Sequence, residues 1–417
     1  MKRLFITVLF SFSVYADVLT LKECVDKTLS SHPDIRTFAL KHSLSKEEQI
    51  SSSAAKYPQV EIHAQYDPVK TFTLSRNSGF DTKNDSMWEV GVSLKQNLWD
   101  FSKTKSRIKA SKISKEMAKL TLEDIKRVIS YRVKTMYLQL ALSLKTIEVR
   151  KKDVESKKAF YEQAKALKKQ GLKTDADTFR FLAALYKAKD LLNSSKNDFL
   201  KVKSSLELYM NEKIPSDVKL EDDILENSEK FSLKELKRRL LSNNISLKEA
   251  KKDLKKSSYI YKSVKSEKYG SFDLVGSYSH IDALFEYDSS LVGISYGMPL
   301  FTGGKLKAEE QKAKIAKMIA KEKIESKKIE LLDELSSLFF DLQSLDWTIK
   351  ARKMEIEALK KAKNVIEGRY KEGLSTYMEV LDAQALLLAG NLSLLQTEYE
   401  KNIKVYKVKY LTGTDNE

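Results

Sequence analysis

The residues in this chain that could bind a metal or act as a nucleophile are few and scattered. The single cysteine, Cys24, has no partner for an internal disulfide, and we interpret it as a small buried residue of the first helix. No glycine-rich phosphate loop and no nucleophile elbow occurs in the sequence. The histidines are not paired at the spacing of metal ligands; they are His32, His42, His63 and His280. We therefore predict a protein that is not an enzyme and that has no cofactor and no metal site.

The composition is that of a folded, helix-rich chain. Its 417 residues are 42% hydrophobic and 32% charged, with only five prolines and 13 glycines. The formal net charge is +17, but the lysines are spread along helical faces together with glutamates and are not gathered in one patch with aromatic residues. This distribution argues against nucleic-acid binding and favours solvated helix surfaces.

The first 16 residues have the pattern of a secretory signal peptide. Met1-Lys2-Arg3 precede a short apolar run, and small residues lead to a cleavage site after Ala16. The alternative is an uncleaved anchor helix, but about twelve apolar residues fall short of the roughly 20 that span a bilayer. We expect no later stretch that could span a membrane as a helix.

The sequence contains an internal duplication. Val90-Gly91-Val92-Ser93 recurs 202 positions later as Val292-Gly293-Ile294-Ser295, and residues 171–174 recur at the same offset as residues 373–376. A constant offset means that the segments between these motifs contain no insertion or deletion. We predict a first repeat over residues 17–210, a linker over 211–231 and a second repeat over 232–417.

Each repeat is predicted to contain a β-hairpin, over residues 57–100 and 269–301. Apolar and polar side chains alternate along all four strands, and the polar faces contain glycine and serine. Aromatic residues lie near the strand ends, as in the girdles of membrane barrels; they are Tyr57, Tyr66, Trp88, Trp99, Tyr269, Tyr278 and Phe301. The alternative is a soluble sheet packed on the helices. Because a closed barrel needs about eight strands, a membrane location requires several chains, and three would supply about twelve.

Helices are predicted to fill the rest of each repeat. The first is expected from Leu19 to Lys56, and very long ones cover roughly residues 101–169 and 304–371. Three-four spacing marks the long helices as coiled-coil seams that return at Gly171 and Gly373 in two antiparallel hairpins. Arg150 and Arg352 occupy equivalent seam positions, where we expect them to set the register of the helices.

Several motifs resemble those of one protein family. Residues 373–384 (Gly-Leu-Ser-Thr-Tyr-Met-Glu-Val-Leu-Asp-Ala-Gln) resemble the second turn and following helix of the TolC-like outer-membrane efflux protein family. Leu19-Thr20-Leu21 with His32-Pro33-Asp34 resemble its N-terminal opening, and Pro299-Leu300-Phe301 with Gly303-Gly304 its second strand-to-helix junction.

The resemblance implies a fold, an assembly and a role. The fold is mainly α with a small β part: long antiparallel coiled-coil hairpins, and four strands per chain in a trimeric, 12-stranded transmembrane barrel. The homotrimer would lie among outer-membrane lipid and extend a helical tube into the periplasm. There it would meet a periplasmic adaptor and an inner-membrane pump and act as the exit duct for their substrates. The nature of the cargo does not follow from the sequence.

The resemblance also points to residues near the helix turns. Glu379 and Asp382 match positions where the family places acidic residues facing the tube interior, so a trimer would contain two rings of carboxylates. Asp177 and Tyr370 match positions that hold the aperture closed, and Gly171 and Gly373 form the turn tips. The alternative for the acidic residues is a simple interaction with the helix macrodipole. Ser375 stands where relatives can have an arginine, and Glu379 replaces the more usual aspartate.

A rival function class is a soluble periplasmic coiled-coil scaffold or adaptor protein. Adaptors normally have a lipoyl-like or small β-barrel domain between their helices, whereas this sequence has only the two hairpins with membrane-like alternation. The sequence assigns no function to residues 211–231.

Overall fold

The computed structural model describes residues 18–76, 79–215, 218–221 and 232–414. The predicted signal peptide, residues 1–16, lies outside the described residues, as does most of the predicted linker. Helices dominate the described chain, which confirms the predicted mainly α fold with a small antiparallel β part. The helices are α1 (Leu21–Ser31), α2 (Pro33–Ala54), α3 (Lys103–Lys169), α4 (Asp175–Met210), α5 (Leu233–Asn243), α6 (Ile245–Ser266), α7 (Lys305–Lys371) and α8 (Tyr377–Thr412).

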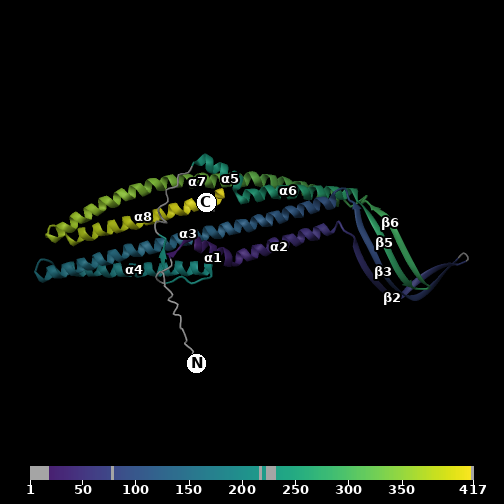
Figure 1. The fold of residues 1–417 in the computed structure, drawn as a ribbon, viewed down its shortest axis with the longest axis horizontal. Coiled ribbons are helices and arrows are strands. Elements are labelled where there is room, and N and C mark those ends of the chain that lie inside the picture. The colour runs from purple at the N-terminus through teal and green to yellow at the C-terminus, as the bar shows by residue number, and fades with distance from the viewer. Residues whose placement is uncertain (1–17, 77–78, 216–217, 222–231, 415–417) are drawn as a thin grey trace, which may run out of the picture. The chain divides into compact units, whose positions relative to one another are not determined.

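The strands form one antiparallel sheet in the order β2-β3-β5-β6 (Figure 1). Its members are β2 (Gln59–Arg76), β3 (Gly79–Trp99), β5 (Ser271–Asp282) and β6 (Glu286–Gly297), and a short parallel pair joins β1 (Val18–Leu19) to β4 (Lys219–Leu220). The register places Ile62 opposite Val92, and Val92 opposite Tyr278, so the apolar side chains share one face. That face is uncovered in the single chain: Ile62 is 79% exposed. A soluble sheet packed on helices through this face is therefore not what the chain forms.

The predicted first helix, Leu19 to Lys56, is in fact two helices. Helix α1 ends at Ser31, and His32 has the extended conformation φ −67°, ψ 130° before α2 begins at Pro33. A proline disfavours the helical conformation of the residue before it, yet its own fixed φ suits the first position of a helix.

The chain divides into two compact units, and each takes segments from both repeats. The first comprises the described parts of residues 1–36, 124–244 and 330–417; the second comprises 37–123 and 245–329. In the first unit, α3 pairs with α4 and α7 pairs with α8 as antiparallel helices joined by short turns, which can be followed in Figure 1. In the second unit, the sheet adjoins α2, α6 and the sheet-proximal ends of α3 and α7.

Within the described residues, α8 alone is long and apolar enough to span a membrane by length and composition. We expected no such stretch from the sequence, and that expectation was wrong by this criterion. Two polar side chains of α8, Gln384 and Asn402, are nevertheless buried against protein. This burial fits a coiled-coil helix with apolar seams, which passes the same test of composition as a membrane helix.

Candidate aperture site at the helix turns

Two glycines allow the helix pairs of the first unit to reverse direction. Gly171 has φ +76° and Gly373 has φ +79°, the left-handed conformation that favours glycine. The amide of Leu172 donates to the carbonyl of Leu167 at 3.0 Å, and Leu374 donates to Arg369 at 2.8 Å. No atom lies within 4 Å of where a Cβ would project from either glycine. Backbone conformation, and not packing, therefore makes these glycines necessary.

The acidic residues that follow the turns begin the next helices in the same way in both repeats. Asp177 accepts hydrogen bonds from the Thr174 amide at 3.0 Å and hydroxyl at 2.9 Å, and the Asp177 amide donates back to Thr174 Oγ1 at 3.2 Å. Glu379 accepts from the Thr376 amide at 2.8 Å in a second capping box. We expected Asp177 to close the aperture and Glu379 to line it. Within one chain the two residues are equivalent helix caps.

Glu379 and Asp382 are both exposed on α8. Their spacing of three residues places them on the same side of the helix, about one turn apart. The hydrogen bond from the Thr376 amide, with help from the Ser375 side chain, holds the pKa of Glu379 below its usual range. Glu379 therefore stays ionised at neutral pH and retains the charge that a selectivity ring needs.

Tyr370 lies in an aromatic cluster to which all four long helices of the unit contribute. Its ring is fully buried and is 6.2 Å from Phe160 of α3 and 5.8 Å from Phe181 of α4. Val380 of α8 belongs to the same core, and Lys173 places its Nζ 4.5 Å from the centre of the Tyr370 ring. The cluster therefore connects the α3–α4 pair to the α7–α8 pair.

The hydroxyl of Tyr370 is buried without a hydrogen-bond partner within the described part of the chain. Burial and the nearby charge of Asp177 raise the pKa of Tyr370 to about 12. Asp177 and Tyr370 are thus close enough to interact electrostatically, although the carboxylate of Asp177 is bonded to Thr174. The contact between helices at Tyr370 depends on ring packing.

A buried polar cluster further along the same helices was not identified from the sequence. Lys157 of α3 is only 7% exposed and donates to Gln384 Oε1 of α8 at 2.6 Å. Gln384 Nε2 donates in turn to Ser156 Oγ at 3.2 Å and to Glu367 Oε1 at 2.9 Å. Burial lowers the pKa of Lys157. The sequence did contain one indication of this cluster. Lys157 lies three residues after the seam residue Val154, at a position where a lysine must enter the interface between helices.

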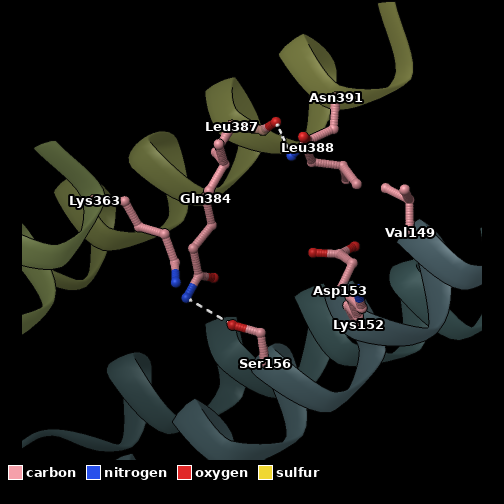
Figure 2. Close-up of a pocket in the computed structure, with 9 residues that line it drawn as sticks. All are labelled: Val149, Lys152, Asp153, Ser156, Lys363, Gln384, Leu387, Leu388 and Asn391. Carbon is pink, nitrogen blue, oxygen red and sulfur yellow. Dashed lines mark hydrogen bonds between the residues drawn. The ribbon is translucent and has the colours of Figure 1, made fainter. Parts of the chain in front are cut away.

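A pocket of about 270 Å³ opens beside this cluster. Figure 2 shows Gln384 and Lys363 directed from one side toward Ser156 and Asp153 on the other, with apolar side chains at one end. Its walls are Val149, Lys152, Asp153, Ser156, Lys363, Gln384, Leu387, Leu388 and Asn391. No group of three or more histidine, cysteine, aspartate or glutamate side chains is arranged to bind a metal in the described ranges. The pocket thus lies between the two helix pairs and has both polar and apolar walls.

The seam arginines differ in their contacts. Arg352 donates from Nη1 to the carbonyl of Ser393, across the α7–α8 pair, as a register-setting residue would. The equivalent Arg150 has a buried Nε with no hydrogen-bond partner among the described residues. The repeat positions are equivalent in sequence, but only Arg352 makes this cross-helix bond.

Comparison with known proteins identifies the family. The profile of the outer membrane efflux protein family matches residues 24–212 and 236–414. This is more than half of the chain, so the chain belongs to the outer membrane efflux protein family. Its location is the outer membrane, with the helical part in the periplasm. The family consists of transporters, not enzymes.

Relatives of known name are distant. The chain is 26% identical to outer membrane protein TolC of Salmonella enteritidis over 137 residues, which is 32% of this chain and 28% of that protein. It is 21% identical to outer membrane efflux protein BepC of Brucella suis over 348 residues, which is 82% of this chain and 76% of the relative. The match thus spans less than a third of TolC but most of BepC.

Solved structures share the fold. The outer membrane protein VceC of Vibrio cholerae superposes with a TM-score of 0.82 at 15% identity, covering 94% of this chain and 96% of that one. The CmeC outer membrane channel of Campylobacter jejuni gives 0.78 at 16% identity, covering 95% and 86%. The predicted resemblance to the TolC-like family is confirmed.

Proposed function

We propose that three copies of this chain form an outer-membrane exit duct that exports substrates from the periplasmic side. The observation that carries the proposal is the four-stranded sheet, whose apolar face is exposed and whose edge strands β2 and β6 each have one unpaired side within the described chain. Open strand edges are not tolerated in hydrocarbon. Neighbouring copies supply the missing strands, and three copies make a barrel of about twelve.

The helices support the same assembly. Helix α7 carries Phe340, Trp347 and Met354 at intervals of seven residues, and all three are exposed, Trp347 by 73%. Helix α4 carries exposed Phe179, Tyr186 and Leu200 at the same periodicity. Apolar side chains at heptad spacing are typical of a coiled-coil seam. Both seams lack a cover in the single chain, and a second copy of the chain would provide it.

Within this duct, Glu379 and Asp382 form two acidic rings near the periplasmic end. Their exposure, their shared side of α8 and the low pKa of Glu379 support the assignment. Rings of like charge attract cations and repel anions at a narrow point. Block of single-channel current by added cations measures this property directly.

The aromatic cluster around Tyr370 keeps the aperture closed at rest. The cluster unites both helix pairs of one chain, so separating the pairs would expose a fully buried ring. Asp177 supports it by capping α4 immediately beside the cluster. The resting conductance of the duct in a planar bilayer reports whether this contact is intact.

A periplasmic adaptor and an inner-membrane pump complete the export path in this proposal. The family relationship supports these partners, and the cargo depends on the pump. The rival scaffold function is not favoured, because the family is an outer-membrane efflux family.

Cell fractionation and bilayer recording test the proposal together. The duct should require detergent for extraction and should give discrete conductance steps when the purified full-length protein is added to a planar bilayer. Release by osmotic shock, with no conductance at any protein concentration, would overturn the proposal in favour of the scaffold.

A further inference from the structure

The junction between β3 and α3 contains an unusual backbone. Phe101 and Ser102 have φ +54° and +72°, a conformation that side chains other than glycine rarely adopt. The equivalent positions in the second repeat are Gly303 and Gly304, with φ +59° and +85°. The turn is thus the same in both repeats, but the first one tolerates strain. Backbone strain of this kind persists only where the surrounding structure holds it, and it is common at functional sites.

Contacts around Phe101 show what its side chain does. Its ring is 6.3 Å from Trp99 and 5.3 Å from Tyr269, while the hydroxyl of Ser266 donates to the Phe101 carbonyl at 2.8 Å. Ser263 donates likewise to the carbonyl of Lys103 at 3.0 Å. These bonds fix the end of α6 against the start of α3. The aromatic ring of Phe101 thus links the junction between β3 and α3 to the junction between α6 and β5.

This aromatic group continues onto the apolar face of the sheet. Trp99 pairs with Phe272 across β3 and β5, and the Phe272 ring stacks on Tyr296 at 4.4 Å. The Tyr296 hydroxyl donates to the carbonyl of Tyr269 at 3.1 Å. Phe272 lies on the face that we assign to lipid. The aromatic group therefore marks the periplasmic boundary of the hydrocarbon, where aromatic residues gather.

Positive charge begins directly beyond these rings. Lys268 places its Nζ 5.2 Å from the centre of the Tyr269 ring, and Lys105 and Lys265 are exposed on the adjoining helix ends. Helix α6 as a whole contains seven lysines and two acidic residues. Lys109 and Lys262 both lie over the ring of Tyr259, so the basic sides of α3 and α6 share one surface.

We propose that this junction is a binding site for anionic phospholipid in the periplasmic leaflet of the outer membrane. The rings of Trp99, Phe101 and Tyr269 lie at the hydrocarbon boundary, and Lys105, Lys265 and Lys268 contact the phosphate groups. The site depends on the outer-membrane location of the chain and not on its role as a duct. Failure of the lipid-site proposal is therefore distinguishable from failure of the proposed duct function, because conductance measurements test the duct function separately.

The position of the lysines provides a matched control. Lys119, Lys251 and Lys255 are also exposed on α3 and α6. Lys119 lies 14 residues after Lys105, and Lys251 and Lys255 lie 14 and 10 residues before Lys265, which is about 15–20 Å along a helix. This exceeds the screening length of about 8 Å at physiological salt. A headgroup layer should therefore interact with the proximal lysines and not with the distal ones.

The test titrates phosphatidylglycerol, with phosphatidylcholine as the neutral control, into full-length protein in non-ionic detergent and counts bound lipids by native mass spectrometry. Replacing Lys105, Lys265 and Lys268 by glutamine should weaken phosphatidylglycerol binding at least tenfold, since one lysine at an anionic surface contributes roughly fivefold. The same change at Lys119, Lys251 and Lys255 should alter it less than about twofold. Phosphatidylcholine binding should stay unchanged in both variants.

A second variant separates lipid binding from folding. Phe101→Gly matches the natural Gly303, so it relieves the backbone strain while it removes the ring. The melting temperature in lipid-free detergent should change little, whereas the increase produced by phosphatidylglycerol should fall by at least half. Equal weakening by the proximal and distal lysine variants would overturn the proposal in favour of a surface for an extended anionic polymer. Wild-type phosphatidylglycerol binding in the proximal variant would also overturn it.

Discussion

At the scale of single residues, one capping motif serves both repeats. Asp177 and Glu379 hold equivalent hydrogen bonds to Thr174 and Thr376. A carboxylate at this position supplies a hydrogen bond and a charge, and only the charge can select ions. An alanine substitution removes both properties at once. Glutamine keeps the hydrogen bond and removes only the charge.

We predict that Glu379→Gln together with Asp382→Asn weakens cation block of single-channel current by roughly tenfold, because six charges leave the two rings. Glu379→Gln alone should have part of this effect with unchanged melting temperature. Glu372→Ala, which removes an exposed carboxylate before the turn, is the control and should leave block unchanged. Wild-type block in the double variant would show that these residues only begin a helix.

Tyr370 gives a second residue-scale prediction. Its contact with Phe160 and Phe181 is made by the ring, and its hydroxyl has no partner in the described chain. Tyr370→Ala should therefore raise the resting conductance and cost about 3–5 kcal/mol of stability, as large-to-small core substitutions do. Tyr370→Phe should leave conductance near the wild-type level. If Phe raised conductance as much as Ala, the hydroxyl and not the ring would hold the aperture closed.

The buried cluster around Lys157 gives a third residue-scale prediction. Lys157→Met and Gln384→Leu should each destabilise the protein by about 1–3 kcal/mol, since each leaves a buried polar partner unsatisfied. The double variant should lose less free energy of unfolding than the two single variants lose in sum. Denaturant unfolding should give a coupling of about 1–2 kcal/mol between the two side chains. Lys158→Met changes an exposed neighbour and should be neutral. Additive costs would show that Lys157 and Gln384 do not act as a pair.

These residues also show what the sequence could and could not predict. The family resemblance of the motif around Gly373 pointed to Glu379, which lies in the first turn of α8. The Lys157–Gln384 pair could not be predicted, because its partners are 227 positions apart. Spacing along one helix does not show which side chains meet across two helices.

At the scale of elements, local chemistry predicted the type of each main element better than its boundaries, since β2 and β3 extend to Arg76 and from Gly79. Alternation located all four strands, and glycine located both turns, because these patterns follow from the backbone geometry of each element. The division between α1 and α2 was missed, although Pro33 was the local signal for it. The strand order, with β3 beside β5, joins the two repeats and has no local signal.

The glycine turns give an element-scale prediction. Gly373→Ala should lower stability by about 1–2 kcal/mol, because an L side chain disfavours the left-handed conformation. The space around the site is open, so the cost is conformational only. Gly368→Ala, in the interior of α7 with equally open space, should instead stabilise the protein by up to about 1 kcal/mol. Thermal unfolding of the two variants side by side measures the difference in stability. A change in stability of the same sign in both variants would refute the prediction.

At the scale of the whole molecule, the single chain is incomplete. Its sheet has an exposed apolar face and two edge strands, and α4 and α7 carry uncovered apolar seams. Each feature is explained by neighbouring copies of the same chain. Strand counting indicates several copies, and the family relationship indicates three.

Breaking the seam with Phe340→Lys and Trp347→Lys should therefore favour smaller particles, whereas the exposed-residue control Glu357→Gln should not.

We infer that the functional particle contains three chains around one barrel. Native mass spectrometry of the full-length protein extracted in mild detergent counts the chains directly. We expect a particle of three chains, which should fall to smaller species in the Phe340→Lys, Trp347→Lys variant. A wild-type particle of one or two chains, at concentrations where the protein conducts ions in bilayers, would contradict it.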